Sequence, residues 1–158
     1  MTSRVYVSLR VPSDPLRAFD VFTREIALWW QPSGLFQITP HGDGVLSFEP
    51  GADGRLVTTM SDGHVFEIGR VSAWEPGKRL KFTWRQASFS PDQSTEVEVL
   101  FEPVGDETRV SVEHCGWDTI PQSHVARHGF PEHATLQRAS EWWRASLNAL
   151  KQRTDRQG

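Results

Sequence analysis

Cysteine is nearly absent from this chain of 158 residues, in which Cys115 is the only one. A single thiol cannot form an internal disulfide bond or supply a cysteine metal cluster. The sequence also has no apolar run near the roughly 18 residues that cross a bilayer, and residues 1–7 lack the apolar core of a signal peptide. We therefore expect a reduced, cytoplasmic protein without a membrane span.

Neither sign of charge dominates, because the chain has 17 basic and 20 acidic residues and a formal net charge of −3. Domains that bind nucleic acids normally carry a basic stripe or a strongly basic overall charge. This sequence has neither feature, and its charges are spread without long runs. We therefore expect no nucleic-acid partner.

Metal and nucleotide sites are also not indicated. His124, His128 and His133 lie close in sequence, but a glycine and a proline interrupt the last two, and no His-Glu-x-x-His pattern is present. The glycines of 42–44 and 51–54 lack the Lys-Ser/Thr ending and the strand-to-helix context of a phosphate-binding loop. We predict no metal site and no cofactor.

Aromatic residues are plentiful, but their types are unevenly represented, with seven tryptophans and nine phenylalanines and only one tyrosine. Each tryptophan brings a large apolar area and one N–H that needs a partner when it is buried. Seven in one small domain exceed what a tight core requires. This excess suggests that some tryptophans line a cavity.

Hydrophobic spacing predicts a first strand over 5–11, two helices after it and a long helix near the end. Asp14 before Pro15 is a favourable helix start, and the spacing predicts helices over about 15–24 and 25–30. The apolar positions of this first helical region are Leu16, Phe19, Phe22 and Ile26. Pro131 is expected to open the long helix, which continues to about Arg153. One stripe of it carries Leu136, Trp143, Leu147 and Leu150, with Trp142 at its flank.

Between residues 45 and 115 the chain has the pattern of short strands joined by hairpins. Turn signals occur at Asp62-Gly63, at Pro76-Gly77 and at 105–107. Apolar residues alternate in three of the strands, namely Leu80/Phe82/Trp84, Val97/Val99/Phe101 and Val110/Val112/His114. Such hairpins predict an antiparallel sheet with one covered face. The expected order is β-α-α-β6-α in one domain spanning 1–158, with an ordered core over about 4–153.

Several segments, taken in order, resemble a known superfamily. They are Val7-Ser-Leu-Arg-Val-Pro-Ser-Asp-Pro15, Phe19–Phe22, Leu28-Trp-Trp30, Gly69–Leu80, Phe82-Thr-Trp84, Val112–Trp117 and Glu141–Leu150. Together they are similar to the START-like helix-grip fold, also called SRPBCC. Within it, the chain resembles the family named for the activator of heat-shock-protein-90 ATPase.

The resemblance implies an α+β fold in which a curved antiparallel sheet of about seven strands grips the long C-terminal helix, with a cavity between them. In such relatives the cavity holds apolar molecules such as lipids, sterols or polyketides, and a minority catalyse cyclisation or hydrolysis there. The eukaryotic activator has a separate domain before this fold, whereas the first strand is expected here from about residue 4. We therefore expect the family name to apply without stimulation of a chaperone ATPase.

His114 is the candidate polar residue of that cavity, since it shares parity with Val110 and Val112 and should point to the covered face. A buried imidazole needs a hydrogen-bond partner or a shifted pKa, and we predict Glu67 as its partner. One interpretation is a ligand anchor or a general acid/base. The other, which we favour, is a core histidine whose hydrogen bonds are satisfied, because no nucleophile or oxyanion site accompanies it. Cys115 has the opposite parity and is expected to be structural.

The tryptophans divide into two groups. Trp84 and Trp143 are expected on apolar faces, whereas Trp30, Trp117 and Trp142 lie near element ends, where a cavity mouth could be. Periodicity does not separate cavity lining from ordinary packing.

Three functions therefore remain open. The first is binding of a small apolar or aromatic ligand by Trp30, Trp84, His114, Trp117, Trp143 and Glu67. The second is a cyclase- or hydrolase-like activity that uses His114 and Glu67. The third is interaction with a protein, either a chaperone or a second copy of the chain.

Overall fold

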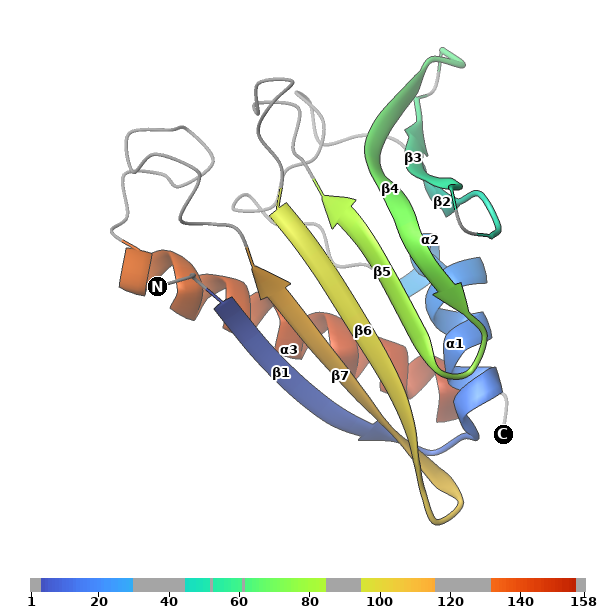
Figure 1. Ribbon diagram of the computed structural model, residues 1–158, viewed down its shortest axis with the longest axis vertical. Helices are drawn as coiled ribbons and strands as arrows, with labels where there is room; N and C mark the ends of the chain where they lie inside the picture. Colours follow the sequence, from blue (N-terminus) through green and yellow to red (C-terminus); the bar gives the residue numbers. More distant parts are fainter. Residues whose placement is uncertain are drawn as a thin grey trace.

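In the computed structural model, which describes residues 4–29, 45–51, 53–60, 62–84, 95–115 and 132–155, seven strands form one antiparallel sheet. The strands are β1 (Arg4–Val11), β2 (Val45–Phe48), β3 (Arg55–Thr59), β4 (Val65–Glu75), β5 (Arg79–Trp84), β6 (Thr95–Val104) and β7 (Glu107–Cys115). Their order across the sheet is β1-β7-β6-β5-β4-β3-β2. The helices α1 (Pro15–Arg24), α2 (Ile26–Trp29) and α3 (Glu132–Asp155) lie on one side of this sheet (Figure 1). The predicted order of elements and fold class are confirmed.

Alternation along β5, β6 and β7 decides which face of the sheet is covered. The eight apolar side chains predicted to face inward are all buried: Leu80, Phe82, Trp84, Val97, Val99, Phe101, Val110 and Val112. The intervening charged residues Lys81, Glu96, Glu98 and Glu113 are half-buried on the outer face. Because side chains in a strand alternate with period 2, this agreement confirms the register. Arg85 lies outside the described residues.

The pairing of β4 is irregular on both of its sides, and Figure 1 shows this strand curving. The register of β3 and β4 shifts between Leu56 and Val57, and that of β4 and β5 shifts between Val71 and Ala73. Between these points a Cβ on Gly69 would lie 1.6 Å from the carbonyl oxygen of Thr83. Glycine therefore allows the backbones of β4 and β5 to approach each other where the sheet bends.

The hairpin turns form where they were predicted. Gly77 follows Pro76 with φ of +76°, as the third residue of a type II turn requires. In the β3–β4 hairpin the loop is longer than the expected two residues. The Met60 N–H donates to the His64 carbonyl, the Gly63 N–H donates to the Met60 carbonyl, and Gly63 has φ of +91°. This pattern matches a three-residue hairpin loop with glycine in the left-handed region.

The first helix begins as the sequence predicts, since the Asp14 carboxylate accepts the Arg17 backbone N–H at 2.8 Å. Phe19, Phe22 and Ile26 are buried, but Leu16 is 54% exposed, contrary to its place in the helical pattern. The backbone of Leu16 packs beside the turn at Gly77. Its side chain therefore lies beside this turn and is exposed.

The long helix places its apolar stripe against the sheet, and β1 is its main contact. Trp143, Leu147 and Leu150 are buried as predicted, and so is the flanking Trp142. The side chain of Leu136 lies outside the described residues. In the part of the chain that the structure describes, no helix is long and apolar enough to cross a membrane.

Candidate functional site

Four side chains from four elements meet in the interior around His114. The imidazole projects inward from the end of β7, and Thr95 stands at the start of the neighbouring β6. The Trp143 indole nitrogen of α3 lies 3.1 Å from His114 Nδ1, and the Thr95 hydroxyl lies 2.7 Å from His114 Nε2. The Thr95 hydroxyl also donates to the Trp84 carbonyl of β5 at 3.0 Å. Trp84, Thr95, His114 and Trp143 are each at most 1% exposed.

The direction of these hydrogen bonds defines the tautomer of His114. An indole nitrogen can only donate, so Nδ1 accepts the Trp143 N–H and carries no proton itself. The proton of the neutral ring is therefore on Nε2, from which it is donated to the Thr95 oxygen. The Thr95 O–H then donates to the Trp84 carbonyl. With this tautomer, each of the three hydrogen bonds from Trp143 to the Trp84 carbonyl has one donor and one acceptor.

Burial keeps His114 neutral. Loss of hydration lowers the pKa of its imidazole to about 3. Aromatic side chains surround the ring, with the Trp84 and Trp143 ring centroids 5.5 and 6.0 Å from that of His114 and both edge-on. A neutral imidazole whose two nitrogens are both bonded is a weak general base. This arrangement agrees with the favoured interpretation of a core histidine with satisfied hydrogen bonds.

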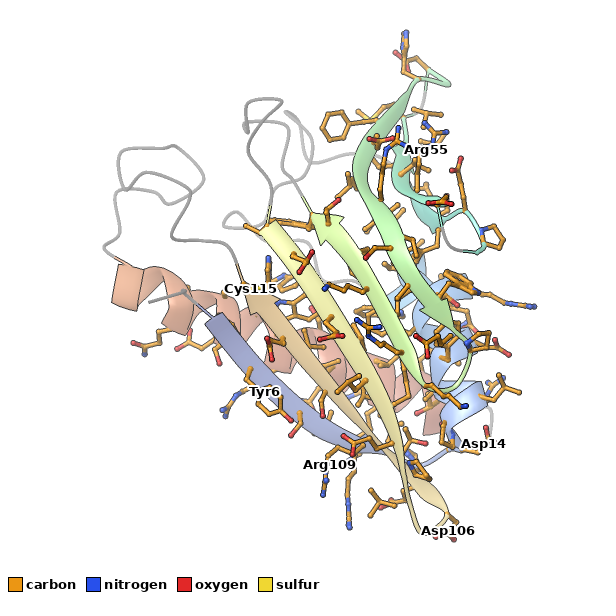
Figure 2. All side chains as sticks on the ribbon, viewed as in Figure 1. Tyr6, Asp14, Arg55, Asp106, Arg109 and Cys115 are labelled. Atoms are coloured by element: carbon orange, nitrogen blue, oxygen red, sulfur yellow. The ribbon has the colours of Figure 1, made fainter. Side chains whose placement is uncertain are left out.

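Glu67 is not the partner of His114, and this prediction was wrong. Its carboxylate lies 3.9 Å from Arg55 Nη1 and 3.5 Å from Arg70 Nε, and its side chain is 32% exposed. Arg55, which is labelled in Figure 2, in turn forms a two-pronged ion pair with Glu49. Glu67 pairs in register with Val57 on the outer face, and β5 and β6 separate its strand from β7. Alternation in the sequence does not reveal the register shift on β4 or which face of the sheet each of its side chains occupies.

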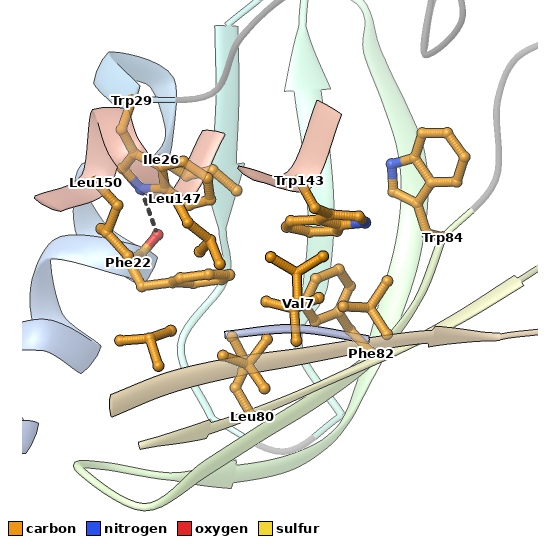
Figure 3. Close-up of a cluster of buried hydrophobic side chains, with 14 of the residues drawn as sticks. Val7, Phe22, Ile26, Trp29, Leu80, Phe82, Trp84, Trp143, Leu147 and Leu150 are labelled. Carbon is orange, nitrogen blue, oxygen red and sulfur yellow. Dashed lines mark hydrogen bonds between the residues drawn. The ribbon is translucent and has the colours of Figure 1, made fainter. Parts of the chain in front are cut away.

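The predicted tryptophans that can be placed lie together. Trp84 and Trp143 are both 1% exposed, and Trp142 stacks edge-on against Trp143 with a centroid distance of 4.8 Å. Figure 3 shows Trp84 and Trp143 on the same side of the core cluster, apart from Trp29. Trp30 and Trp117 lie outside the described residues, as do the side chains of His124, His128 and His133. Cys115 is half-buried on β7 next to His114 in sequence.

Thr95 is the member of this cluster that sequence reasoning missed. It precedes the alternating residues Val97, Val99 and Phe101 by two positions, so the same period places it on the inner face. That signal was available. Its bond to His114, however, depends on the pairing of β6 with β7, which brings together residues 19 apart in sequence.

The sheet wrapped on α3, with its buried polar cluster, defines a START-like helix-grip protein. Within this class, the chain belongs to the family of activator of Hsp90 ATPase homolog 1-like proteins, whose model matches residues 13–155. No curated protein sequence matches the chain significantly.

Solved structures share the fold at low sequence identity. The protein MLL2253 from Mesorhizobium loti is 23% identical with a TM-score of 0.68, and the match covers 98% of both chains. CV1439 from Chromobacterium violaceum is 17% identical with a TM-score of 0.62 over 96% of both chains. DynU16, a putative protein in the dynemicin biosynthetic locus, is 20% identical with a TM-score of 0.61, over 95% of this chain and 46% of that one.

Proposed function

We propose that the protein binds a small, largely apolar or aromatic molecule between the sheet and α3, beside Trp84, His114 and Trp143. The supporting observation is the hydrogen-bonded network that residues of four elements form inside a largely apolar interior. Ligand sites combine mostly apolar and aromatic walls with a few well-placed polar groups.

The two tryptophans would contribute most of the affinity. Burial of apolar surface is worth about 25 cal/mol per Å², and indole rings offer large flat areas for it. His114 holds the Trp143 ring by its N–H, so its part is to position the wall. Trp30 and Trp117 remain predicted members of the cavity mouth. Membership of DynU16 in the biosynthetic locus of a natural product is in line with a small-molecule ligand.

A cyclase- or hydrolase-like reaction at His114 is less well supported than binding. The ring proton is directed at Thr95, so the imidazole cannot accept the Thr95 proton without a change of tautomer. After such a change His114 Nδ1 would carry the proton, so two hydrogen-bond donors, this N–H and that of Trp143, would face each other. A mechanism at this position would therefore begin by breaking the buried network.

Interaction with another protein is the second candidate, because the family is named for an activator of a chaperone ATPase. An apolar patch of several hundred Å² would mark such a surface. The exposed large apolar residues of the described chain are Tyr6, Leu16, Leu28, Val45, Val65 and Leu100. Val45 and Val65 flank Thr59 in the register of β2, β3 and β4, and the other four lie on four separate elements. Binding of a small molecule in the interior is therefore the better supported function.

Tryptophan fluorescence tests the proposal directly. Titration with apolar aromatic probes should quench or shift the emission, with a Kd below about 1 mM, which corresponds to about −4 kcal/mol. Trp143→Phe should lose most of that change. Trp29→Phe is the matched control, since Trp29 is equally buried at the other side of the core and should leave the change intact.

Mass spectrometry of the purified protein under native conditions would identify a retained ligand. Absence of any retained molecule, together with no probe binding below millimolar concentration, would overturn the proposal and favour a protein partner. A fluorescence change that both Trp143→Phe and Trp29→Phe retain would place binding outside the proposed site.

A further inference from the structure

Three buried hydroxyl groups of the described residues have no hydrogen-bond partner. Among the described residues, the side-chain oxygens of Thr58, Ser111 and Ser146 are buried and make no hydrogen bond. Each of these residues is at most 2% exposed. A buried hydroxyl without a partner costs free energy that valine or alanine at the same position would not. Such groups therefore call for an explanation, and a bound molecule that supplies the missing partner is one.

Ser146 lies on the face of α3 that covers the sheet. It follows Ala139 and Trp143 and precedes Leu150 on the buried stripe, and it is 0% exposed. A serine within a helix commonly donates to the carbonyl of the preceding turn. The Ser146 hydroxyl makes no such bond. Its hydrogen-bonding capacity is therefore unused on the buried face of α3.

Thr58 is the equivalent group on the sheet. It has the same parity on β3 as Leu56, which belongs to the core, and it pairs in register with Leu46 of β2 and Phe66 of β4. All three neighbours are apolar, so none can accept or donate a side-chain hydrogen bond. Thr58 is 0% exposed, although threonine in a strand is easily replaced by valine of nearly the same shape.

The buried polar residues of the described chain carry no charge. They are the hydroxyl residues Thr23, Thr58, Thr95, Thr108, Ser111, Ser146 and Thr154, together with the neutral His114. A carboxylate or ammonium group that entered this interior would lose its hydration without gaining an opposite charge, which is strongly unfavourable. A neutral hydroxyl or carbonyl, in contrast, could form hydrogen bonds with the unpartnered hydroxyls.

Resting on the proposed function, we propose that Ser146 and Thr58 are specificity-determining residues that select a neutral, oxygen-bearing ligand over an anionic one. The hydroxyl of Ser146 binds the ligand from the helix, and that of Thr58 binds from the sheet. Apolar walls supply affinity, and these two groups distinguish an oxygenated ring system from its hydrocarbon and carboxylate counterparts.

Three naphthalene probes of nearly equal shape test this inference at pH 7. Naphthalene is apolar, 2-naphthol is neutral because phenols ionise near pH 10, and 2-naphthoate is an anion because carboxylic acids ionise near pH 4. Calorimetry and ligand-observed NMR should show 2-naphthol binding about 5- to 100-fold more tightly than naphthalene. They should show 2-naphthoate binding at least about tenfold more weakly than 2-naphthol.

The variants Ser146→Ala and Thr58→Val remove one hydroxyl each with little change of shape. At least one of them should abolish most of the preference for 2-naphthol while leaving naphthalene binding unchanged. Ser111→Ala is the matched control. Its hydroxyl is equally buried and unpartnered, but it pairs in register with the exposed Ser8 and Leu100 on the outer face. It should leave all three affinities unchanged.

The outcomes separate the two proposals. Failure of all three probes to bind would count against the proposed function itself. Binding of naphthalene without a preference for 2-naphthol, binding of 2-naphthoate as tight as that of 2-naphthol, or an equal loss in Ser111→Ala would overturn only the assignment of Ser146 and Thr58.

Thermal unfolding of the unliganded protein gives an independent measurement. If the hydroxyls have no partner, Thr58→Val and Ser146→Ala should raise Tm by about 2–4 °C each, because a cost of burial is removed. A fall in Tm in both variants would show that the hydroxyls are already bonded within the protein, and this would overturn the inference.

Discussion

The two sides of the hydrophobic core differ in how they satisfy their buried polar groups. Around Trp29, the indole N–H donates to the carbonyl of Phe22, seven residues earlier, at 3.1 Å (Figure 3). Phe19, Phe22 and Phe101 pack edge to face beside it, with centroid distances of 5.3 and 5.9 Å. Around His114, the polar groups instead require partners from β5, β6 and α3.

The two sides therefore differ in how far apart in the chain their hydrogen-bond partners lie. The Trp29 side uses a local bond within the α1–α2 segment, and aromatic and aliphatic side chains such as Phe22, Ile26 and Leu150 pack around it (Figure 3). The His114 side holds a network whose members come from distant parts of the chain, so a single loss leaves buried groups without partners. We therefore expect the His114 side to be more sensitive to polar substitution.

The largest effect is expected from truncating the wall of the proposed site. Trp143→Ala should lower the free energy of unfolding by about 3–5 kcal/mol, because it leaves a cavity between α3 and the sheet. It also removes the donor to His114 Nδ1. Urea denaturation measures the change. A loss below about 1 kcal/mol would contradict the burial of Trp143.

Acid sensitivity should distinguish His114 from an exposed histidine. Burial lowers the pKa of folded His114 to about 3, below its unfolded value near 6.5, so the unfolded chain takes up the proton first. The stabilisation is complete above about pH 6.5 and is lost as the pH falls toward 3, at about 1.4 kcal/mol per pH unit. Between pH 6.5 and 5 this amounts to about 2 kcal/mol.

Denaturation curves at several pH values check this slope, which His114→Gln should largely remove. His64 is the control, because its exposed ring pairs with Asp62, which raises its pKa. Its contribution has the opposite sign, being present at low pH and lost as the pH rises through the folded pKa. An unchanged slope in His114→Gln would show that His114 is charged or exposed.

Replacing the indole by a phenyl ring, which removes the N–H donor and part of the ring volume on each side, compares the two sides most directly. Trp143→Phe should cost about 1–3 kcal/mol, since it leaves the buried His114 Nδ1 unpaired. Trp29→Phe should cost less, about 0.5–1.5 kcal/mol, because it removes a single local bond to the Phe22 carbonyl. Equal losses of unfolding free energy in the two variants, measured by chemical denaturation, would contradict this difference between the two sides.

The smallest effect is expected at the cap of α1, which carries the Trp29 side of the core. Asp14→Ala should lower stability by about 1 kcal/mol, because the Arg17 N–H loses its acceptor. Asp14→Asn should restore most of the loss, since asparagine caps equally well. A loss in both variants would indicate that the charge of Asp14 matters rather than the cap.

Most of the fold could be predicted from the sequence. Hydrophobic alternation in β5, β6 and β7 reflects the two-residue period of a strand. This period is the same whichever strand is the neighbour in the sheet. The same holds for the helix start at Asp14 and for the turn at Gly77, which depend on local backbone preferences. Leu16 shows the limit of this reasoning, since a helical pattern does not say where the surface beneath the helix ends.

The candidate site could be predicted only in part. The inward position of His114 follows from its parity with Val110 and Val112, and so does its burial. Its partners do not follow. Glu67 alternates with Val65, Gly69 and Val71, a pattern that predicts an inward side chain, but it binds Arg55 and Arg70 on the outer face. Strand order and the irregular pairing of β4 decided this, and neither is encoded in a local pattern.

The sequence alone therefore determined the elements and the buried face of each, because these depend on chemistry repeated every few residues. The tertiary structure decided the state of His114. Trp143 reaches it from 29 residues away and Thr95 from 19, and their donors and acceptors define its tautomer. Complete burial then keeps the ring neutral. The protonation state of the His114 imidazole depends on its neighbours in space, and these come together only when the sheet packs on α3.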